Sequence, residues 1–363
     1  MQLSLHELHQ QLNARFTDVN GMEAVEDYGD FLVEYSALRT SVGVLDLSFR
    51  SRIVLTGADR VRFLNGQVTN NIKDLPSGTG CYAALITNKG KMQSDANIYI
   101  LPNEILLDFE PGLAAPIAKR LKGYIIADDA QVVDAAPHYG LLSVQGPGAW
   151  AAIQAIGLNF MRPEKPFAWT GIHDTMLGEI YCMNQPRLGS AGYDLFVPIS
   201  SLAAIADKLI AAARDLGGRP CGWRALETAR IEAGIPRFGA EMNETNLPPE
   251  AGIEQRAISY SKGCYIGQEV IARLRTYGQV AKALRGLRFA DDLKSPPAKG
   301  EKLWFNGKEV GYVASAIHSP AADANIGLGY VRREQNKVGN ELTLKTATGE
   351  SVVKIVETPF TSQ

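Results

Sequence analysis

The C-terminal part of the chain restricts the possible folds most strongly, because it carries strand signals without any helical pattern. From residue 282 to residue 363, short apolar and β-branched stretches alternate with turn residues. Asn306-Gly307 stands between two such stretches, and this dipeptide is a strong signal for a two-residue hairpin. Five or six strands in about 80 residues predict a small β-barrel or sandwich.

The preceding residues 1–281 alternate strands and helices, with hairpins between them. RIVLTG predicts a strand that is followed by a helix with Asp59 as its N-cap. Two β-rich runs flank Asn88-Lys89-Gly90, which predicts a hairpin turn. This order favours an α+β fold on antiparallel sheets over a doubly wound one. No G-x-G-x-x-G follows a strand, so the sequence does not indicate a dinucleotide site.

Two helices have clear patterns. Leucines at helical spacing predict a helix over residues 3–16. A longer helix follows Pro198, with Ser200 or Ser201 expected as its cap and Gly217 as its end.

Charge and cysteine content exclude several functional classes. The net charge of −2 and the pI near 6.3 give no electrostatic reason to expect nucleic acid or membrane binding. We find neither a signal peptide nor an apolar run long enough to cross a membrane. The cysteines form no C-x-x-C pair and no zinc spacing with the histidines, so we expect no metal site and no disulfide framework. The sequence therefore predicts a cytoplasmic protein.

The stretch KGCYIGQE contains the cysteine most suited to chemistry, Cys264. A thiolate is stabilised by a nearby cation or a helix N-terminus. Lys262 is two residues away, and GQEVIARLR predicts a helix with Glu269 in its first turn. Gly263 and Gly267 allow unusual backbone conformations or a close approach to a ligand. The alternative is that Cys264 is a small buried hydrophobic residue, as free cysteines often are.

KGCYIGQE resembles the signature K-G-C-Y-x-G-Q-E of the YgfZ proteins, which are folate-binding relatives of the glycine-cleavage T-protein. TGADRVRFLNGQVTNNI and ITNKGKMQSDANIYI are similar to the family's early strand-helix and hairpin. RIEAGIPRFGAEMNETNLPPEAG resembles the R-x-E-A-G segment shared with T-proteins. The resemblance covers most of the chain.

The resemblance implies an α+β, T-protein-like multidomain fold: antiparallel-sheet lobes around a folate channel, followed by a C-terminal β-barrel. The expected folate-binding region is 1–281, with two interleaved lobes at about 1–52 with 138–281 and at 53–137, and the barrel is 282–363. It also implies that tetrahydrofolate or another reduced folate binds. YgfZ proteins support the assembly or repair of iron-sulfur proteins, and this function depends on the motif cysteine, so iron-sulfur client or assembly proteins are the expected partners.

The resemblance also indicates site residues. A pterin needs a carboxylate and an aromatic or apolar slot, and the glutamate tail of folate needs a cation. Arg230 and Glu232 match R-x-E, and Tyr193 falls where T-proteins have an aromatic-acid pair. Each has a plain alternative: an i, i+2 pair for the first two, and a core aromatic for Tyr193. The other expected folate contacts come from the motif itself: Tyr265, Gly263, Gly267, Gln268 and Glu269.

The alternative function is a tetrahydrofolate-dependent aminomethyltransferase or a related one-carbon transferase. T-proteins carry paired aspartates after the hairpin, where this chain has Ser94-Asp95, so the resemblance implies that Asp95 is the retained catalytic acid. The acid of their T-G-E-D-G segment is replaced near Ser190. These losses, together with the K-G-C-Y motif, favour the YgfZ-like accessory role with Cys264 and Lys262 at its centre. A third reading is a folate-binding relic without activity.

Overall fold

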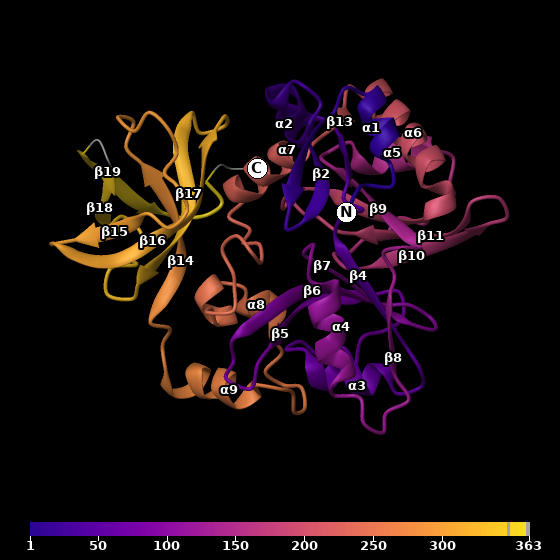
Figure 1. Cartoon of the computed structure of the whole chain (residues 1–363), viewed down its shortest axis with the longest axis horizontal. Helices are drawn as coiled ribbons and strands as arrows, with labels where there is room; N and C mark the ends of the chain where they lie inside the picture. Colours follow the sequence, from indigo (N-terminus) through magenta and orange to yellow (C-terminus); the bar gives the residue numbers. More distant parts are fainter. Residues whose placement is uncertain (347–348, 361–363) are drawn as a thin grey trace. The chain divides into compact units, whose positions relative to one another are not determined.

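The computed structural model describes residues 1–346 and 349–360, and Figure 1 labels its helices and strands. These elements fall into two units. Unit 1 comprises Met1–Ala83 and Ser94–Glu227, and unit 2 comprises Ala84–Gln93 and Thr228–Gln363. The predicted boundary near residue 281 thus falls inside unit 2, where the barrel begins. In the described part of the chain, no helix is both long and apolar enough to cross a membrane.

Unit 1 contains a six-stranded sheet with two helices on one face. Its strand order is β10 (Trp169–Asp174), β11 (Gly178–Asn184), β12 (Gly192–Pro198), β9 (Tyr139–Gln145), β3 (Gly43–Asp46) and β13 (Arg219–Pro220). All neighbours pair antiparallel except β13, which runs parallel to β3. The helices are α5 (Ala149–Ala155) and α6 (Ile199–Asp215), and they bury apolar side chains such as Leu202 and Leu209 against the sheet.

The predicted C-terminal end of helix α6 is confirmed, but the predicted N-cap is wrong. Gly217 has a φ of +75°, and the amide of Gly218 donates back to the carbonyl of Ala213 at 2.7 Å, which closes the helix. Pro198 occupies the N-cap position, and no side chain caps this end. The hydroxyl of Ser201 donates instead to the carbonyl of Leu177 at 2.9 Å.

The second sheet of unit 1 has the order β5 (Gly80–Ile86), β6 (Met92–Ile100), β7 (Ile105–Phe109), β4 (Ser51–Thr56) and β8 (Gln131–Asp134), accompanied by α3 (Arg60–Gln67) and α4 (Ala114–Lys122). The predicted hairpin is confirmed between β5 and β6, where Gly90 takes a φ of +75°. Asp59 stands at the N-cap of α3, but its carboxylate accepts from the amide of Asp129 at 2.9 Å and does not cap the helix.

The N-terminal segment is less helical than predicted. Helix α1 (His6–Gln11) ends early, because Asn13 takes a left-handed φ of +60°, and the chain continues into the hairpin β1 (Arg15–Val19) and β2 (Met22–Asp27). Helix α2 (Phe31–Thr40) follows, capped by the side chain of Asp30.

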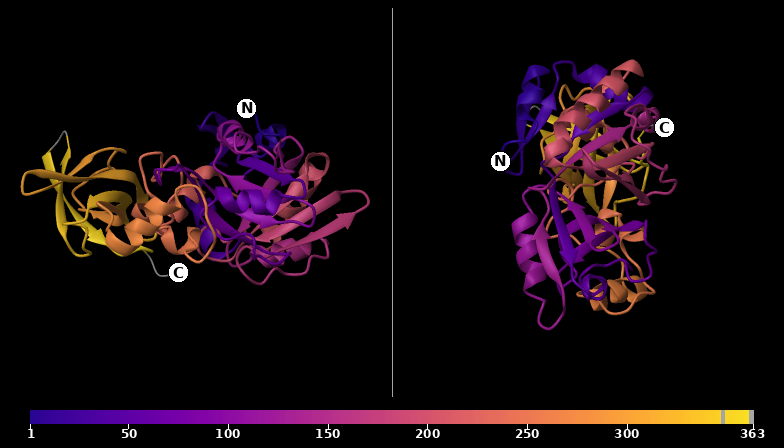
Figure 2. Two further views of the ribbon diagram at one scale, coloured as in Figure 1. Left: turned by 90° about the horizontal axis from the view of Figure 1, so that it is seen from below. Right: turned by 90° about the vertical axis from the view of Figure 1, so that its right-hand side faces the viewer.

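Unit 2 ends in a closed barrel with the order β14 (Lys282–Phe289), β17 (Ala324–Arg332), β16 (Lys308–Ser319), β15 (Lys302–Phe305), β18 (Glu341–Thr346) and β19 (Gly349–Val356). Asn306 and Gly307 both take positive φ in the turn between β15 and β16, as predicted. Helix α7 (Trp223–Glu232), the 3-10 turn η1 (Pro248–Ala251) and helices α8 (Glu254–Ala257) and α9 (Gln268–Tyr277) precede the barrel. The left view of Figure 2 shows the barrel strands from another side. The α+β class with a C-terminal β-barrel is therefore confirmed.

Candidate functional site

Asp95 lies on β6 beside Tyr82 of the neighbouring strand β5. The Tyr82 hydroxyl donates a hydrogen bond to Oδ2 of Asp95 at 2.6 Å. The Asp95 side chain keeps some solvent exposure, but the protein around the carboxyl group raises its pKa to about 6, through burial first and through the nearby Glu110 second. A carboxyl group with this pKa exchanges its proton near neutral pH, as general acid–base catalysis requires.

Arg50 is the positive charge that partly offsets the raised pKa of Asp95. Its Nη1 donates to Glu110 at 2.6 Å and its Nε to Asp108 at 2.7 Å, and all three side chains are buried. Burial alone would lower the pKa of Arg50 and raise that of Asp108. Asp108 and Glu110 outweigh burial and raise the pKa of Arg50, while Arg50 and Arg187 hold that of Asp108 below its ordinary range.

The network continues from the five-stranded sheet to the six-stranded sheet of unit 1. Nη2 of Arg187 lies 2.9 Å from Asp108 on β7 and 2.6 Å from Asp194 on β12. The sequence reading missed Arg50, Asp108, Arg187 and Asp194. Asp108 and Asp194 could have been found, because a carboxylate inside an otherwise apolar strand is uncommon unless it is paired. Arg50 and Arg187 lie outside the strands and gave no such signal.

The motif loop in unit 2 places Lys262 and Tyr265 together. Both are buried, and Nζ of Lys262 lies 5.0 Å from the centre of the Tyr265 ring. This distance allows a cation–π interaction. Burial also raises the pKa of the Tyr265 hydroxyl to about 12. The ammonium group that was expected to act on Cys264 therefore faces an aromatic ring.

Cys264 itself is exposed, which confirms that its thiol is accessible to solvent and contradicts the buried alternative. It stands three residues before the N-cap of α9, Gly267. Cys182 and Cys221 are buried, and Cys81 is half-buried. Burial raises the pKa of the Cys182 and Cys221 thiols. Because the thiolate is the reactive form, these two cysteines are expected to react more slowly than Cys264.

The remaining motif residues have distinct environments. Gly267 takes a φ of +80°, and a Cβ there would lie 2.3 Å from the carbonyl oxygen of Thr87, so only glycine fits. Gly263 is exposed, with no atom within 4 Å of an added Cβ. The amide of Gln268 donates to the carbonyl of Tyr265 at 3.2 Å. Glu269 points to solvent from the first turn of α9 and pairs with Arg273 at 2.5 Å.

Arg230 and Glu232 are both buried on α7, but they have different partners. Arg230 forms a buried ion pair with Glu241 at 2.7 Å, and its Nη1 also donates to the carbonyl of Ile235 at 3.2 Å. The carboxylate of Glu232 accepts from the hydroxyl of Ser319 on β16. These contacts fix the segment that follows α7 and join it to the barrel.

Tyr193 lies in the core of the six-stranded sheet. It is 2 % exposed, and its ring centre is 5.2 Å from that of Trp150. Nε of Arg162 donates to its hydroxyl at 2.9 Å. This is the position of a packed aromatic with a satisfied hydroxyl group. Tyr193 and Asp95 belong to unit 1, whereas the motif, Arg230 and Glu232 belong to unit 2.

The described side chains contain no group of three or more His, Cys, Asp or Glu residues arranged to hold a metal ion. Two groups suited to chemistry have been described, the protonatable carboxyl group of Asp95 in unit 1 and the exposed thiol of Cys264 in unit 2.

Two family profiles together cover nearly the whole chain. The GCVT N-terminal domain matches residues 5–262, and the glycine cleavage T-protein C-terminal barrel domain matches residues 282–361. The second match begins at the first residue of β14, so it coincides with the closed barrel.

Curated relatives and a solved structure agree with these profiles. The chain is 26% identical over 359 residues to an aminomethyltransferase of Shouchella clausii, covering 98% of this chain and 96% of that protein. It is 28% identical to one of Bacillus subtilis, covering 98% of both. The crystal structure of glycine cleavage system aminomethyltransferase T from Bartonella henselae superposes with a TM-score of 0.90, at 23% identity, over 100% of this chain and 98% of that one, which shows a shared fold. These relatives are named as aminomethyltransferases, and the YgfZ branch stays a prediction from the motif.

Proposed function

Because the chain belongs to the glycine-cleavage T-protein family, we propose that it binds tetrahydrofolate and transfers a one-carbon unit to it, as an aminomethyltransferase does. The observation that carries this proposal is the Asp95 carboxyl group, with a pKa of about 6 and a hydrogen bond from Tyr82. The accessory role inferred from the motif is the weaker reading, because the named relatives are transferases.

The environment of Asp95 fits a folate in one definite respect. Oδ2 accepts from Tyr82, and no ion pair of Asp95 occurs among the residues that the structure describes. Oδ1 can therefore accept from an N–H group of a ligand, and the pterin ring carries such groups. A ligand donor at this carboxyl group would stabilise its ionised form, which burial disfavours.

Tetrahydrofolate supplies a ring nitrogen that takes up the one-carbon unit. The chain's part is to hold and move a proton at Asp95, whose pKa lies close enough to neutrality for both directions of transfer. Tyr82 fixes the orientation of the carboxyl group through its hydrogen bond. Arg50 neutralises Asp108 and Glu110, so that these buried acids do not raise the pKa of Asp95 further.

The test is ammonia release by the purified protein with tetrahydrofolate and an aminomethylated lipoyl donor. Asp95→Asn is expected to reduce the rate by about 100-fold or more, the usual contribution of a general acid or base, and to weaken folate binding much less, by the loss of one hydrogen bond. Asp134→Asn, at an exposed position of the same sheet, is the matched control and should leave the rate unchanged. Wild-type protein that releases no ammonia although it binds folate would rule out the transferase.

Arg230 and Glu232 enter the proposal as folate contacts of unit 2. Calorimetric titration with tetrahydrofolate should show weaker binding by Glu232→Gln. Ser319→Ala removes the same buried hydrogen bond from the other side and serves as the control. Equal weakening in both variants would mean that Glu232 acts only through the fold.

One observation favours a second candidate, the YgfZ-like support of iron-sulfur proteins in the cytoplasm. Cys264 is exposed in the K-G-C-Y loop, a position suited to a thiol that reacts with a partner protein or a small molecule. In a cell that lacks its own YgfZ protein, the wild-type chain should restore iron-sulfur enzyme activity and Cys264→Ala should not. Full rescue by Cys264→Ala, or no rescue by the wild-type chain, would exclude this role.

A further inference from the structure

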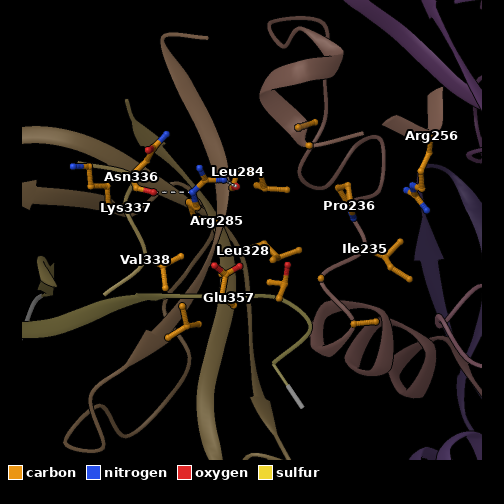
Figure 3. A pocket seen from close by; sticks show the side chains of 17 residues that line it. Ile235, Pro236, Arg256, Leu284, Arg285, Leu328, Asn336, Lys337, Val338 and Glu357 are labelled. Atoms are coloured by element: carbon orange, nitrogen blue, oxygen red, sulfur yellow. Dashed lines mark hydrogen bonds between the residues drawn. The ribbon is translucent and has the colours of Figure 1, made fainter. Parts of the chain in front are cut away.

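Unit 2 contains a pocket that is made by the barrel and the segments preceding it. Its volume is about 670 Å³, within the usual range for small-molecule sites. Strands β14, β17 and the end of β19 form one wall, and residues 233–236 and 251–256 form the other (Figure 3). None of the residues assigned above to folate or to proton transfer lines it.

Arg285 is the central polar group of this pocket. Its Nε donates to the carbonyl of Asn336 at 2.8 Å, and its Nη1 donates to the carbonyl of Leu284 at 3.1 Å (Figure 3). These two bonds hold the half-buried guanidinium group, which has five N–H donors in a fixed fork. Within residues 1–346 and 349–360, Arg285 has no carboxylate partner, so its remaining donors are available to a ligand.

The charges that line the pocket favour an anion. Arg285 is joined by Lys337 on the rim and Arg256 on the opposite wall, and Glu357 is the one acid in the lining. The apolar part comes from side chains such as Leu284 and Val338. A ligand suited to these walls carries a carboxylate for the guanidinium fork and an aliphatic body for the apolar surface.

The walls are held by buried contacts rather than by loose loops. The carbonyl of Ile235 accepts from Arg230, which is itself ion-paired with Glu241. On the barrel side, a Cβ on Gly234 would lie 2.5 Å from the Cβ of Thr358, so the side chain of Thr358 packs directly against the backbone of Gly234. A pocket fixed in this way loses little conformational entropy when a ligand binds.

We propose that this pocket binds a small aliphatic carboxylate, with the carboxylate group on the guanidinium of Arg285. The proposal does not depend on folate chemistry. Its ligand is recognised by charge and by an aliphatic chain of a few carbons, so glutarate is the appropriate probe and inorganic phosphate is the comparison.

The experiment is calorimetric titration of the full chain with glutarate and with phosphate. Glutarate should bind, and more tightly than phosphate, because only glutarate can also cover the apolar wall. Arg285→Gln should weaken binding by at least tenfold, through the loss of a charge-assisted, bidentate contact. Glu357→Gln should strengthen binding by about twofold or more, since it removes the acid from the lining.

Arg288→Gln is the matched control, because Arg288 lies on the same strand and is not part of the lining. It should bind glutarate within twofold of the wild type. The gain expected for Glu357→Gln cannot come from misfolding, so it separates recognition from damage to the fold. The proposal is overturned if glutarate does not bind, if phosphate binds as tightly, if Arg285→Gln binds unchanged, if Glu357→Gln gains nothing, or if Arg288→Gln loses binding equally.

Discussion

The two glycines of the KGCYIGQE loop should respond very differently to the same substitution. Gly267 has a φ of +80°, and an added Cβ would lie 2.3 Å from the carbonyl oxygen of Thr87 and 2.8 Å from Cδ1 of Ile86. A backbone carbonyl cannot rotate away as a flexible side chain can. Gly263, four residues earlier, does not have a positive φ, and nothing lies within 4 Å of its added Cβ.

The left-handed conformation costs an alanine about 1–2 kcal/mol. Moving the Thr87 carbonyl, or the start of α9, adds to this, so Gly267→Ala should reduce the free energy of unfolding by about 2–4 kcal/mol in total. Gly263→Ala should change it by less than about 0.5 kcal/mol, as exposed substitutions without steric conflict usually do.

Thermal unfolding of the two variants, side by side with the wild type, measures this difference. Gly267→Ala should lower the Tm of the transition that includes unit 2 by roughly 4–16 °C, and Gly263→Ala should leave it unchanged. If Gly267→Ala has the same Tm as the wild type, the loop does not need a residue with a left-handed conformation at this position, and the steric reasoning is wrong. The same holds if both variants are equally destabilised.

Three other outcomes follow from the charges and the exposure of side chains. Because the pKa of Asp95 is raised to about 6 in the folded state, the free energy of unfolding measured in urea should fall as the pH rises from about 4 to about 6. In the Asp95→Asn variant, this free energy should fall less over the same pH range. Arg50→Met removes the cation between buried Asp108 and Glu110, of which Asp108 keeps Arg187, and should reduce the free energy of unfolding by about 3 kcal/mol in urea denaturation. Arg62→Met, at an exposed ion pair, should reduce it by less than about 1 kcal/mol. An alkylating reagent at neutral pH should modify exposed Cys264 well before buried Cys221, as mass spectrometry of tryptic peptides would show; equal rates would contradict the exposure.

Local signals predicted the elements that local geometry determines. The hairpin turns at Gly90 and at Asn306-Gly307 need positive φ, and their residue types show this directly. The end of α6 at Gly217 follows the same rule. The early end of α1 was missed, although Asn13 was visible, because regularly spaced leucines continued up to it and asparagine is only one of several residues that end helices.

Side-chain partners across long sequence distances could not be predicted in the same way. Arg50 donates a hydrogen bond to Asp108, which lies 58 residues away in the sequence, and Arg187 donates one to the same Asp108 from 79 residues away. Asp59 is a residue type that often caps helices and stands at the N-cap position, yet its carboxylate accepts a hydrogen bond from the distant backbone amide of Asp129 instead. The resemblance indicated Asp95 as a candidate, but its environment, with a hydrogen bond from Tyr82 and the charges of Glu110 and Arg50 nearby, follows only from how the strands of this sheet align.

The hairpin between β5 and β6 has a consequence for how the chain can be divided. Its tip, Ala84–Gln93, belongs to unit 2, where the amide of Met92 donates to the carbonyl of Asn246 and Nζ of Lys91 donates to the carbonyl of Thr245. The chain therefore passes between the units three times, and a single cut near residue 228 leaves the C-terminal fragment without ten of its own residues. On the ribosome, this tip emerges long before its partners in unit 2 are made, so it waits unpaired until the segment around Asn246 has been synthesised. A fragment of unit 2 should fold properly only when the hairpin is grafted back or added as a peptide.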